Sequence, residues 1–161
     1  MNFIARQEDF STLEMIEFNK YHIVNLERVC NSNPNIYQLR FFANNSKIYE
    51  ISPILYSEDR IEDAYWRDDV ISLEGGNYWR FNHLEEPALQ TGTSIEEIVS
   101  LYRDVRHMGR RVGIVEVNMR ARDFFHGMYQ DSAQSDSFIC VVDRNKQMHW
   151  NKNNGMLKDR S

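Results

Sequence analysis

Two groups of side chains have the types and spacing that acid–base chemistry or metal binding would need. Asp123 and His126 stand three residues apart in a segment with helical periodicity, so both would lie on one face of a helix. His83 with Glu85 and Glu86 forms a polar cluster in a predicted loop. Neither group brings a full set of metal ligands together, and a solvent-exposed helix pair and a polar loop are the simpler interpretations. We therefore predict no catalytic residue, no metal site and no cofactor.

The motifs that mark common enzyme classes are also missing from the sequence. It contains no G-x-S-x-G, no H-E-x-x-H, no P-loop and no G-x-G-x-x-G. The two cysteines, Cys30 and Cys140, lack C-x-x-C spacing, and each lies in an apolar segment where cysteine commonly packs as a small hydrophobic residue. A single long-range disulfide stays open as the alternative, so the redox state of the pair is undetermined. We predict that this segment is not an enzyme.

Binding chemistry is better represented. The stretch from 65 to 81 is rich in aromatic residues, whose flat apolar faces stack on sugar rings or small amphipathic ligands. Arg103 could hold a carboxylate or phosphate through two hydrogen bonds. The predicted ligand-binding set consists of Trp66, Tyr78, Trp79, Arg80, Tyr102, Arg103 and Asp104. The alternative is that these aromatic residues form the core, as they more often do in a small α+β domain.

Composition limits the class of protein. The chain has 161 residues, of which 42% are hydrophobic and 12% aromatic, so it can bury the core of one domain and is not a disordered chain. Its net charge of −5 argues against duplex DNA as a partner, and the arginines between 103 and 122 are interpreted as a solvated hairpin tip and helix start. No run approaches the ~18 apolar residues of a membrane span, and the first residues do not form a signal peptide.

The N-terminal segment predicts a helix. Ser11 and Glu14 form a capping box, and Phe10 and Met15 stand where a hydrophobic staple belongs. The helix should run to about Cys30 and stop at the breaker at 31–34. At 100° per residue, one arc of this helix would be apolar and packed on the rest of the domain. Its members are Met15, Ile16, Phe18, Ile23, Leu26, Val29 and Cys30.

The rest of the chain predicts an α+β fold. Strands are expected at 36–42 and 78–81, a short helix at 54–64 with Ser52 as N-cap, an otherwise irregular segment at 65–81, and a loop at 85–94. Strands 98–105 and 112–119 should form a hairpin at Gly109, followed by a helix at 121–129. Strands 138–142 and 147–150 should join the same antiparallel sheet, with the helices gathered on one side. The apolar positions Val115, Val117 and Met119 should be buried, and Glu116 and Asn118 should face water.

Three phrases in the correct order carry a family resemblance. IVSLYRDVRHMGRRVGIVEVNMRARDFF at 98–125 resembles the late hairpin and helix of the extracytoplasmic Cache (PAS-like) sensor module of YesM-type bacterial sensor histidine kinases. NIYQLRFFANNSKIYEISPILYSEDRI at 35–61 is similar to the family's first strand and the loop and short helix after it. FICVVDRNKQMHW at 138–150 is similar to the last hairpin. The resemblance divides the chain into an N-terminal helix and linker at 1–34, a Cache sensor domain at 35–150 and a polar tail at 151–161.

The resemblance implies the extracytoplasmic part of a bacterial cell-membrane protein in a two-component system, whose membrane helices and kinase would lie outside this segment. It implies a homodimeric receptor that binds a small-molecule ligand or an extracytoplasmic binding protein, and no nucleic acid. Ligands of such domains lie between the concave face of the sheet and the irregular segment, here Trp66–Arg80 with Tyr102–Asp104. Residues 60–66 read RIEDAYW and lack the Arg-x-Trp-Tyr run of amino-acid sensors, so a carbohydrate is the better family-level expectation.

Binding would shift the packing of the sheet against the N-terminal helix and so transmit the signal to the kinase. Two alternatives from other classes stay open. One is an intracellular PAS-like binding or scaffold domain, and the other is a small enzyme of unrecognised type. The sequence does not identify the ligand, and it does not decide whether one binds directly.

Overall fold

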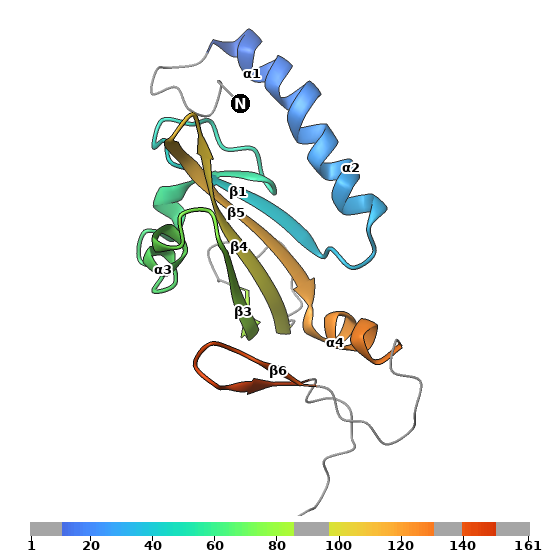
Figure 1. Ribbon diagram of the computed structural model, residues 1–161. Coiled ribbons are helices and arrows are strands. Elements are labelled where there is room, and N and C mark those ends of the chain that lie inside the picture. The colour runs from blue at the N-terminus through green and yellow to red at the C-terminus, as the bar shows by residue number, and fades with distance from the viewer. Residues whose placement is uncertain (1–10, 86–96, 131–139, 151–161) are drawn as a thin grey trace, which may run out of the picture.

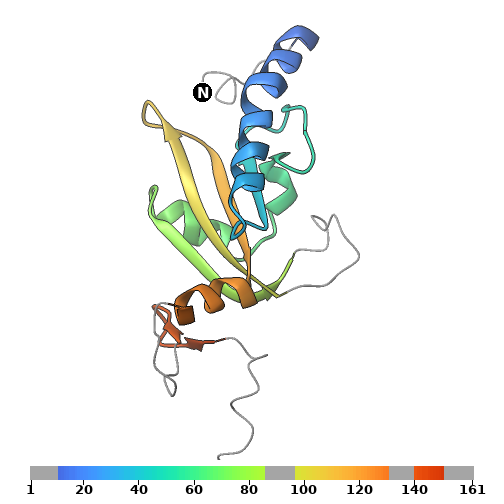
Figure 2. The same ribbon diagram turned by 90° about the vertical axis from the view of Figure 1, so that its right-hand side faces the viewer.

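The computed structural model describes residues 11–85, 97–130 and 140–150. A five-stranded sheet with strand order β2–β1–β5–β4–β3 forms its centre. Figure 1 shows this sheet between the N-terminal helix on one side and α3 on the other, and Figure 2 gives the view turned by 90°. The mixed α+β architecture is as predicted. The helices lie on both faces of the sheet, so the expectation that they gather on one side is wrong.

The N-terminal helix is continuous over 21 residues. It consists of α1 (Thr12–Phe18), a π-helical turn (Asn19–Ile23) and α2 (Val24–Ser32). The predicted capping box is confirmed, because the Ser11 backbone N–H donates to Glu14 Oε2 at 3.0 Å and the Glu14 N–H donates to Ser11 Oγ at 3.3 Å. In the predicted staple, Phe10 and the Met15 side chain lie outside the described residues. The helix ends two residues beyond the predicted Cys30.

The π-helical turn changes which side of this helix is apolar and buried. Phe18 and Ile23, five residues apart, are both buried, whereas Ile16 and Val29 of the predicted arc are exposed. A turn closed by i→i+5 hydrogen bonds holds more residues than an α-helical turn, so later side chains are rotated from the positions that 100° per residue predicts. The predicted arc is therefore correct only in part. Cys30 and Cys140 are free cysteines, and burial raises the pKa of the Cys30 thiol.

The predicted central hairpin is confirmed. β4 (Glu97–His107) and β5 (Arg110–Arg120) pair antiparallel and are joined at Met108 and Gly109, whose φ angles are 49° and 77°. Two successive positive φ angles are typical of a type I′ turn, whose twist matches that of the strands. The helix α4 (Ala121–Gln130) follows directly, as predicted. β3 (Asn77–Leu84) pairs antiparallel with β4, and β1 (Gln38–Ala43) pairs antiparallel with β5.

Other predicted elements differ from the structure. The predicted helix at 54–64 is replaced by β2 (Leu55–Ser57), which pairs parallel with β1, and by a 3₁₀ turn (Glu58–Ile61). Ser57, not Ser52, caps this turn by accepting the Asp59 N–H at 3.2 Å. Residues 54–58 are all buried, so this run is inserted between layers and cannot present the polar face of a surface helix. The segment predicted as irregular also contains α3 (Arg67–Ser72).

The final hairpin does not join the main sheet. β6 (Val141–Val142) and β7 (Met148–His149) form a separate two-stranded sheet, so the prediction of a single sheet is wrong for them. The hairpin contacts β3 through side chains and has no backbone hydrogen-bond ladder with it among the described residues. The His149 ring stacks on Phe81 at 4.8 Å between centroids, and Asn82 Nδ2 donates to the Trp150 carbonyl at 3.0 Å.

Three apolar clusters hold the layers together. One lies between α3 with the 3₁₀ turn and the sheet face that carries Phe42, Tyr102 and Ile114, which we call the inner face. The second joins the N-terminal helix to β1 and β2 on the opposite, outer face, and the third lies beneath α4. The buried members of the inner cluster are Phe42, Tyr56, Ile61, Trp66, Val70, Tyr102 and Ile114.

Candidate functional site

The inner face is apolar near α3 and polar along the middle of the sheet. Directly opposite residues of an antiparallel pair point to the same side, so the strand register defines rows of neighbouring side chains. Two adjacent rows of the inner face consist entirely of side chains with polar groups. They are Arg40, Glu116, Tyr102 and Tyr78 in the first row, and Gln38, Asn118, Ser100 and Arg80 in the second.

Arg40 lies at the β1 end of the first row. Its side chain is 1% exposed, and Nη1 lies 3.1 Å from Glu116 Oε2 while Nη2 contacts Glu85 Oε1. Burial opposes the charge of Arg40, but the charges of Glu116 and Glu85 outweigh it and raise the pKa of the guanidinium. Burial also raises the pKa of Glu116, although Arg40 acts against this. One cation is thus enclosed with two carboxylates inside the protein.

The second row continues into a chain of hydrogen bonds. Ser100 Oγ donates to Asn118 Oδ1, and His83 Nε2 lies 2.8 Å from Ser100 Oγ. His83 Nδ1 lies 2.9 Å from the Leu84 carbonyl oxygen. These bonds join β3, β4 and β5 across the inner face and fix the Asn118 amide in place.

Two uncharged side chains at this face each leave one polar atom without a hydrogen-bond partner. Trp66 Nε1 and Gln38 Oε1 are shielded from solvent and make no hydrogen bond to any described residue. The Tyr102 hydroxyl and the Asn118 amide stabilise the Glu116 carboxylate as hydrogen-bond donors. The rings of Trp66 and Tyr102 stack with their centroids 4.0 Å apart. A buried donor or acceptor left unpaired costs about 1–3 kcal/mol, so folded proteins satisfy almost all such groups. An enclosed solute or water would supply the missing partners.

The structure divides the predicted binding set between the two faces. Trp66, Tyr78, Arg80, Tyr102 and Asp104 belong to the inner face, whereas Trp79 and Arg103 lie on the outer face. Trp79 is 40% exposed and its ring lies against Phe81 and Phe124, on the outer face. The seven residues therefore do not form one site. The core interpretation is correct for the Trp66 and Tyr102 rings, which are fully buried.

Asp104 belongs to a separate ionic chain at one end of the inner face. Its Oδ1 accepts from Arg111 Nε at 2.7 Å and its Oδ2 accepts from Arg106 Nε at 2.9 Å. Arg111 also donates to Glu58, whose second oxygen lies 2.6 Å from Arg67 Nη2. This chain ties the β4–β5 hairpin to the 3₁₀ turn and α3. Two arginines of the hairpin are thus structural ion-pair partners.

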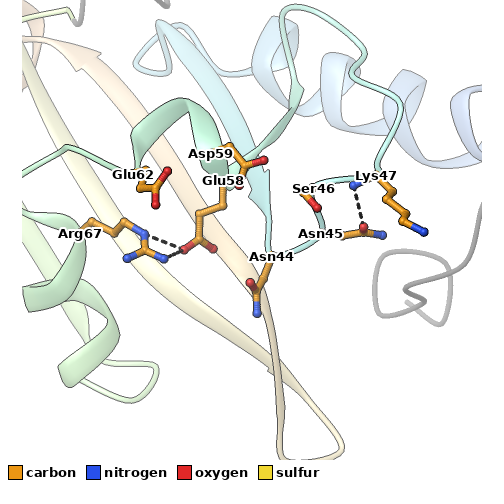
Figure 3. Close-up of a pocket in the computed structure, with 8 residues that line it drawn as sticks. All are labelled: Asn44, Asn45, Ser46, Lys47, Glu58, Asp59, Glu62 and Arg67. Carbon is orange, nitrogen blue, oxygen red and sulfur yellow. Dashed lines mark hydrogen bonds and ion pairs between the residues drawn. The ribbon is translucent and has the colours of Figure 1, made fainter.

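A surface pocket of about 460 Å³ lies beside the Glu58–Arg67 ion pair, which forms part of its lining (Figure 3). In Figure 3 Glu58 and Arg67 point toward each other, and the turn after β1 forms the opposite wall. Glu58 is already bound by two arginines, so the pocket presents a satisfied ion pair. We consider it a weaker site than the inner face. Its lining residues are Asn44, Asn45, Ser46, Lys47, Glu58, Asp59, Glu62 and Arg67.

The two groups of candidate acid–base residues lie on different elements of the structure. Asp123 lies 3.3 Å from Arg122 Nε on the surface of α4, and His126 is exposed there. His83 takes part in the second row, and Glu86 lies outside the described residues. In the described part of the chain no group of three or more His, Cys, Asp or Glu side chains could hold a metal ion. Within the same ranges no helix has the length and apolarity to cross a membrane.

Comparison of the chain with protein-family models, with curated proteins and with solved structures finds no match.

Proposed function

We propose that this chain is a signal-sensing domain that binds a small polar ligand between the inner face of the sheet and its cover of α3 and the 3₁₀ turn. The observation that carries the proposal is the pair of buried polar atoms without a hydrogen bond, Trp66 Nε1 and Gln38 Oε1, beside the buried polar rows of the sheet. Such atoms are costly unless a bound molecule satisfies them. The Trp66 ring stacks on Tyr102, which is opposite Glu116 in the first polar row.

The resemblance to Cache domains of YesM-type sensor histidine kinases supports the same location. Such domains hold their ligand between the sheet and the irregular segment ahead of its middle strands, and here residues 61–76 cover the inner face. The three similar phrases fall on β1 to the 3₁₀ turn, on β4 to α4, and on β6–β7. The parallel β1–β2 pair and the separate last hairpin are departures from the antiparallel sheet that we expected.

In this proposal the chain is the extracytoplasmic sensor of a membrane-bound, homodimeric histidine kinase. The N-terminal helix contacts β1 and β2 through a small cluster that includes Phe18 and Ile23. Because β1 also carries Arg40 on its inner face, a ligand that moves this strand would change how the helix packs. The helix and the chain ends would transmit that change to the kinase.

A thermal-unfolding screen tests the proposal. The 161-residue chain is scanned with a panel of neutral sugars, polyols, organic acids, amino acids and amines. A ligand at about 100 times its Kd adds roughly 2.7 kcal/mol to the free energy of unfolding, which a melting scan detects easily. The shift should be lost in Asn118→Leu and kept in Trp79→Phe, which changes only the outer face. If no compound raises the Tm of the folded protein, the inner-face site is wrong and sensing through a partner protein becomes the favoured mechanism.

A further inference from the structure

The β4–β5 hairpin extends beyond the strands on either side of it. β3 pairs with β4 as far as Arg103, and β1 pairs with β5 as far as Gly113. Residues 105–111 therefore have strand partners only within their own hairpin. Figure 2 shows the tip of this hairpin, in yellow, clear of β3. A free-standing tip of this kind is accessible to a surface outside the domain.

The turn places an apolar side chain at its outermost point. Met108 is 90% exposed, more than any other large apolar side chain of the described residues. It has a φ of 49° at the first central position of the turn, where Asn, Asp or Gly is the usual residue. Neither the geometry of the turn nor the packing of the core explains a methionine at this position.

The residues around this turn are basic. The stretch 105–115 contains three arginines and one histidine and no Asp or Glu, although the whole chain has a net charge of −5. Arg110 is exposed and forms no ion pair with a described residue. Arg106 and Arg111 share the Asp104 carboxylate at the base of the tip. An exposed apolar side chain beside positive charge complements an anionic lipid surface.

We propose that the tip of the β4–β5 hairpin docks on an anionic membrane surface, with Met108 entering the interface and Arg110 facing the lipid phosphates. Arginine binds phosphate oxygens through paired hydrogen bonds, and burial of the methionine side chain adds a hydrophobic contribution. A protein partner needs a contact of roughly 800 Å² on each side, which a single tight turn does not offer, whereas a membrane interface accepts a narrow tip.

The acidic groups elsewhere in the chain do not prevent this contact. Charges farther from the membrane than the Debye length, about 10 Å at about 0.1 M salt, are largely screened. The domain should therefore bind in one orientation, with the hairpin tip toward the lipid. This inference goes beyond the proposed function and does not depend on the inner-face site.

Co-sedimentation of the full chain with lipid vesicles tests the docking. Vesicles of phosphatidylcholine are compared with vesicles that also contain phosphatidylglycerol, over a lipid titration in the millimolar range at low and at physiological salt. We expect binding to the anionic vesicles only, and weaker binding at the higher salt concentration. Equal binding to the two kinds of vesicle, or binding to neither, overturns the proposal.

Variants of the tip separate its two contributions. Met108→Asn supplies the usual turn residue, so it should keep or raise the Tm while lowering the partition coefficient about tenfold. Arg110→Gln should lower the partition coefficient about fivefold. Arg103→Gln, an exposed arginine on the body of the sheet, is the matched control and should leave it unchanged. Binding to poly-glutamate that is as strong as to anionic vesicles and unaffected by Met108→Asn would assign the tip to an acidic protein and overturn the proposal.

Discussion

The two faces of one sheet show how the same strands serve two different roles. On β5, Glu116 and Asn118 are 3% and 0% exposed on the inner face, while Val115 and Val117 on the outer face are only half-buried. The alternation of the sequence separates the two faces correctly. The prediction that Glu116 and Asn118 face solvent is wrong. It assumed that the face with apolar side chains is the buried face. The inner face is buried because α3 and the 3₁₀ turn cover it, although it carries charged and amide side chains.

The difference follows from what packs on each face. The inner face is closed by α3, the 3₁₀ turn and Trp66, and its polar groups are paired across strands, as Arg40 is with Glu116. Among the described elements, the N-terminal helix covers the outer face at β1, and α4 covers it at the other end. The middle of that face is thus apolar but half open. The buried polar side is accordingly where we place binding.

The largest expected contrast is between two tryptophans. Trp66→Ala removes a fully buried ring and should lower the free energy of unfolding by about 3–5 kcal/mol. Trp79→Ala removes a ring that is partly exposed beside Phe81 and Phe124, and should cost roughly 1–2 kcal/mol. Urea denaturation of the two variants measures both values. Equal costs would mean that the outer face is as well packed as the inner face.

Two arginines give the corresponding contrast for charge. Arg40→Met keeps the volume but leaves Glu85 and Glu116 buried without their cation, so we expect a loss of about 3–5 kcal/mol at pH 7. Arg103→Met, on an exposed outer-face position, should stay within about 0.5 kcal/mol of the wild type. A small loss in Arg40→Met would show that the buried carboxylates are neutral or solvated.

The capping box offers a smaller test outside the sheet. Ser11→Ala removes the hydroxyl that accepts the Glu14 N–H and should cost on the order of 1 kcal/mol. In the proposed mechanism a ligand changes how this helix packs on β1, so the loss should differ with and without a saturating inner-face ligand. An equal loss under both conditions would contradict coupling between the helix and the inner face.

Two carboxylates should give opposite pH dependence. The pKa of Glu116 is raised above its ordinary 4.5, so the folded state binds more protons than the unfolded state between 4.5 and the raised pKa. Stability from this group is full below pH 4.5 and falls as the pH rises through that window. The Arg60 hydrogen bond lowers the pKa of Glu50, whose contribution is full above 4.5 and is lost as the pH falls through the lowered pKa.

Urea melts from pH 3 to 8 of Glu116→Gln and Glu50→Gln resolve these slopes. Relative to the wild type, Glu116→Gln should remove the loss of stability above pH 4.5, and Glu50→Gln should remove a loss below it. Identical pH profiles for the two variants would contradict the assignment of a buried, raised pKa to Glu116.

Local signals in the sequence predicted several elements well. The capping box at Ser11, the Gly109 hairpin and the helix after Met119 each depend on residues close together in the chain. The π-helical turn and the short β2 were not predicted. The π-helical turn changes the number of residues per helical turn, which the prediction took as constant. Strand β2 forms because it pairs parallel with β1, where Phe41 is opposite Leu55.

The site was predicted only in part, for a related reason. Arg40 and Glu116 are 76 residues apart, and their burial follows from being opposite each other in the sheet. A signal was nevertheless present. Polar side chains occupy alternate positions of three predicted strands, and antiparallel pairing brings them to one face. They are Gln38 and Arg40, Ser100 and Asp104, and Glu116 and Asn118.

The central claim is that a ligand contacts the buried polar atoms of the inner face, and the indole N–H groups report on it directly. The chain has three tryptophans, whose side-chain amide signals in a ¹H–¹⁵N spectrum are assigned with Trp66→Phe and Trp79→Phe. On titration with a compound that raises the Tm, the Trp66 Nε1–H signal should shift and become protected from exchange, and the Trp79 signal should stay in place. A shift of the Trp79 signal with an unchanged Trp66 signal would contradict the account.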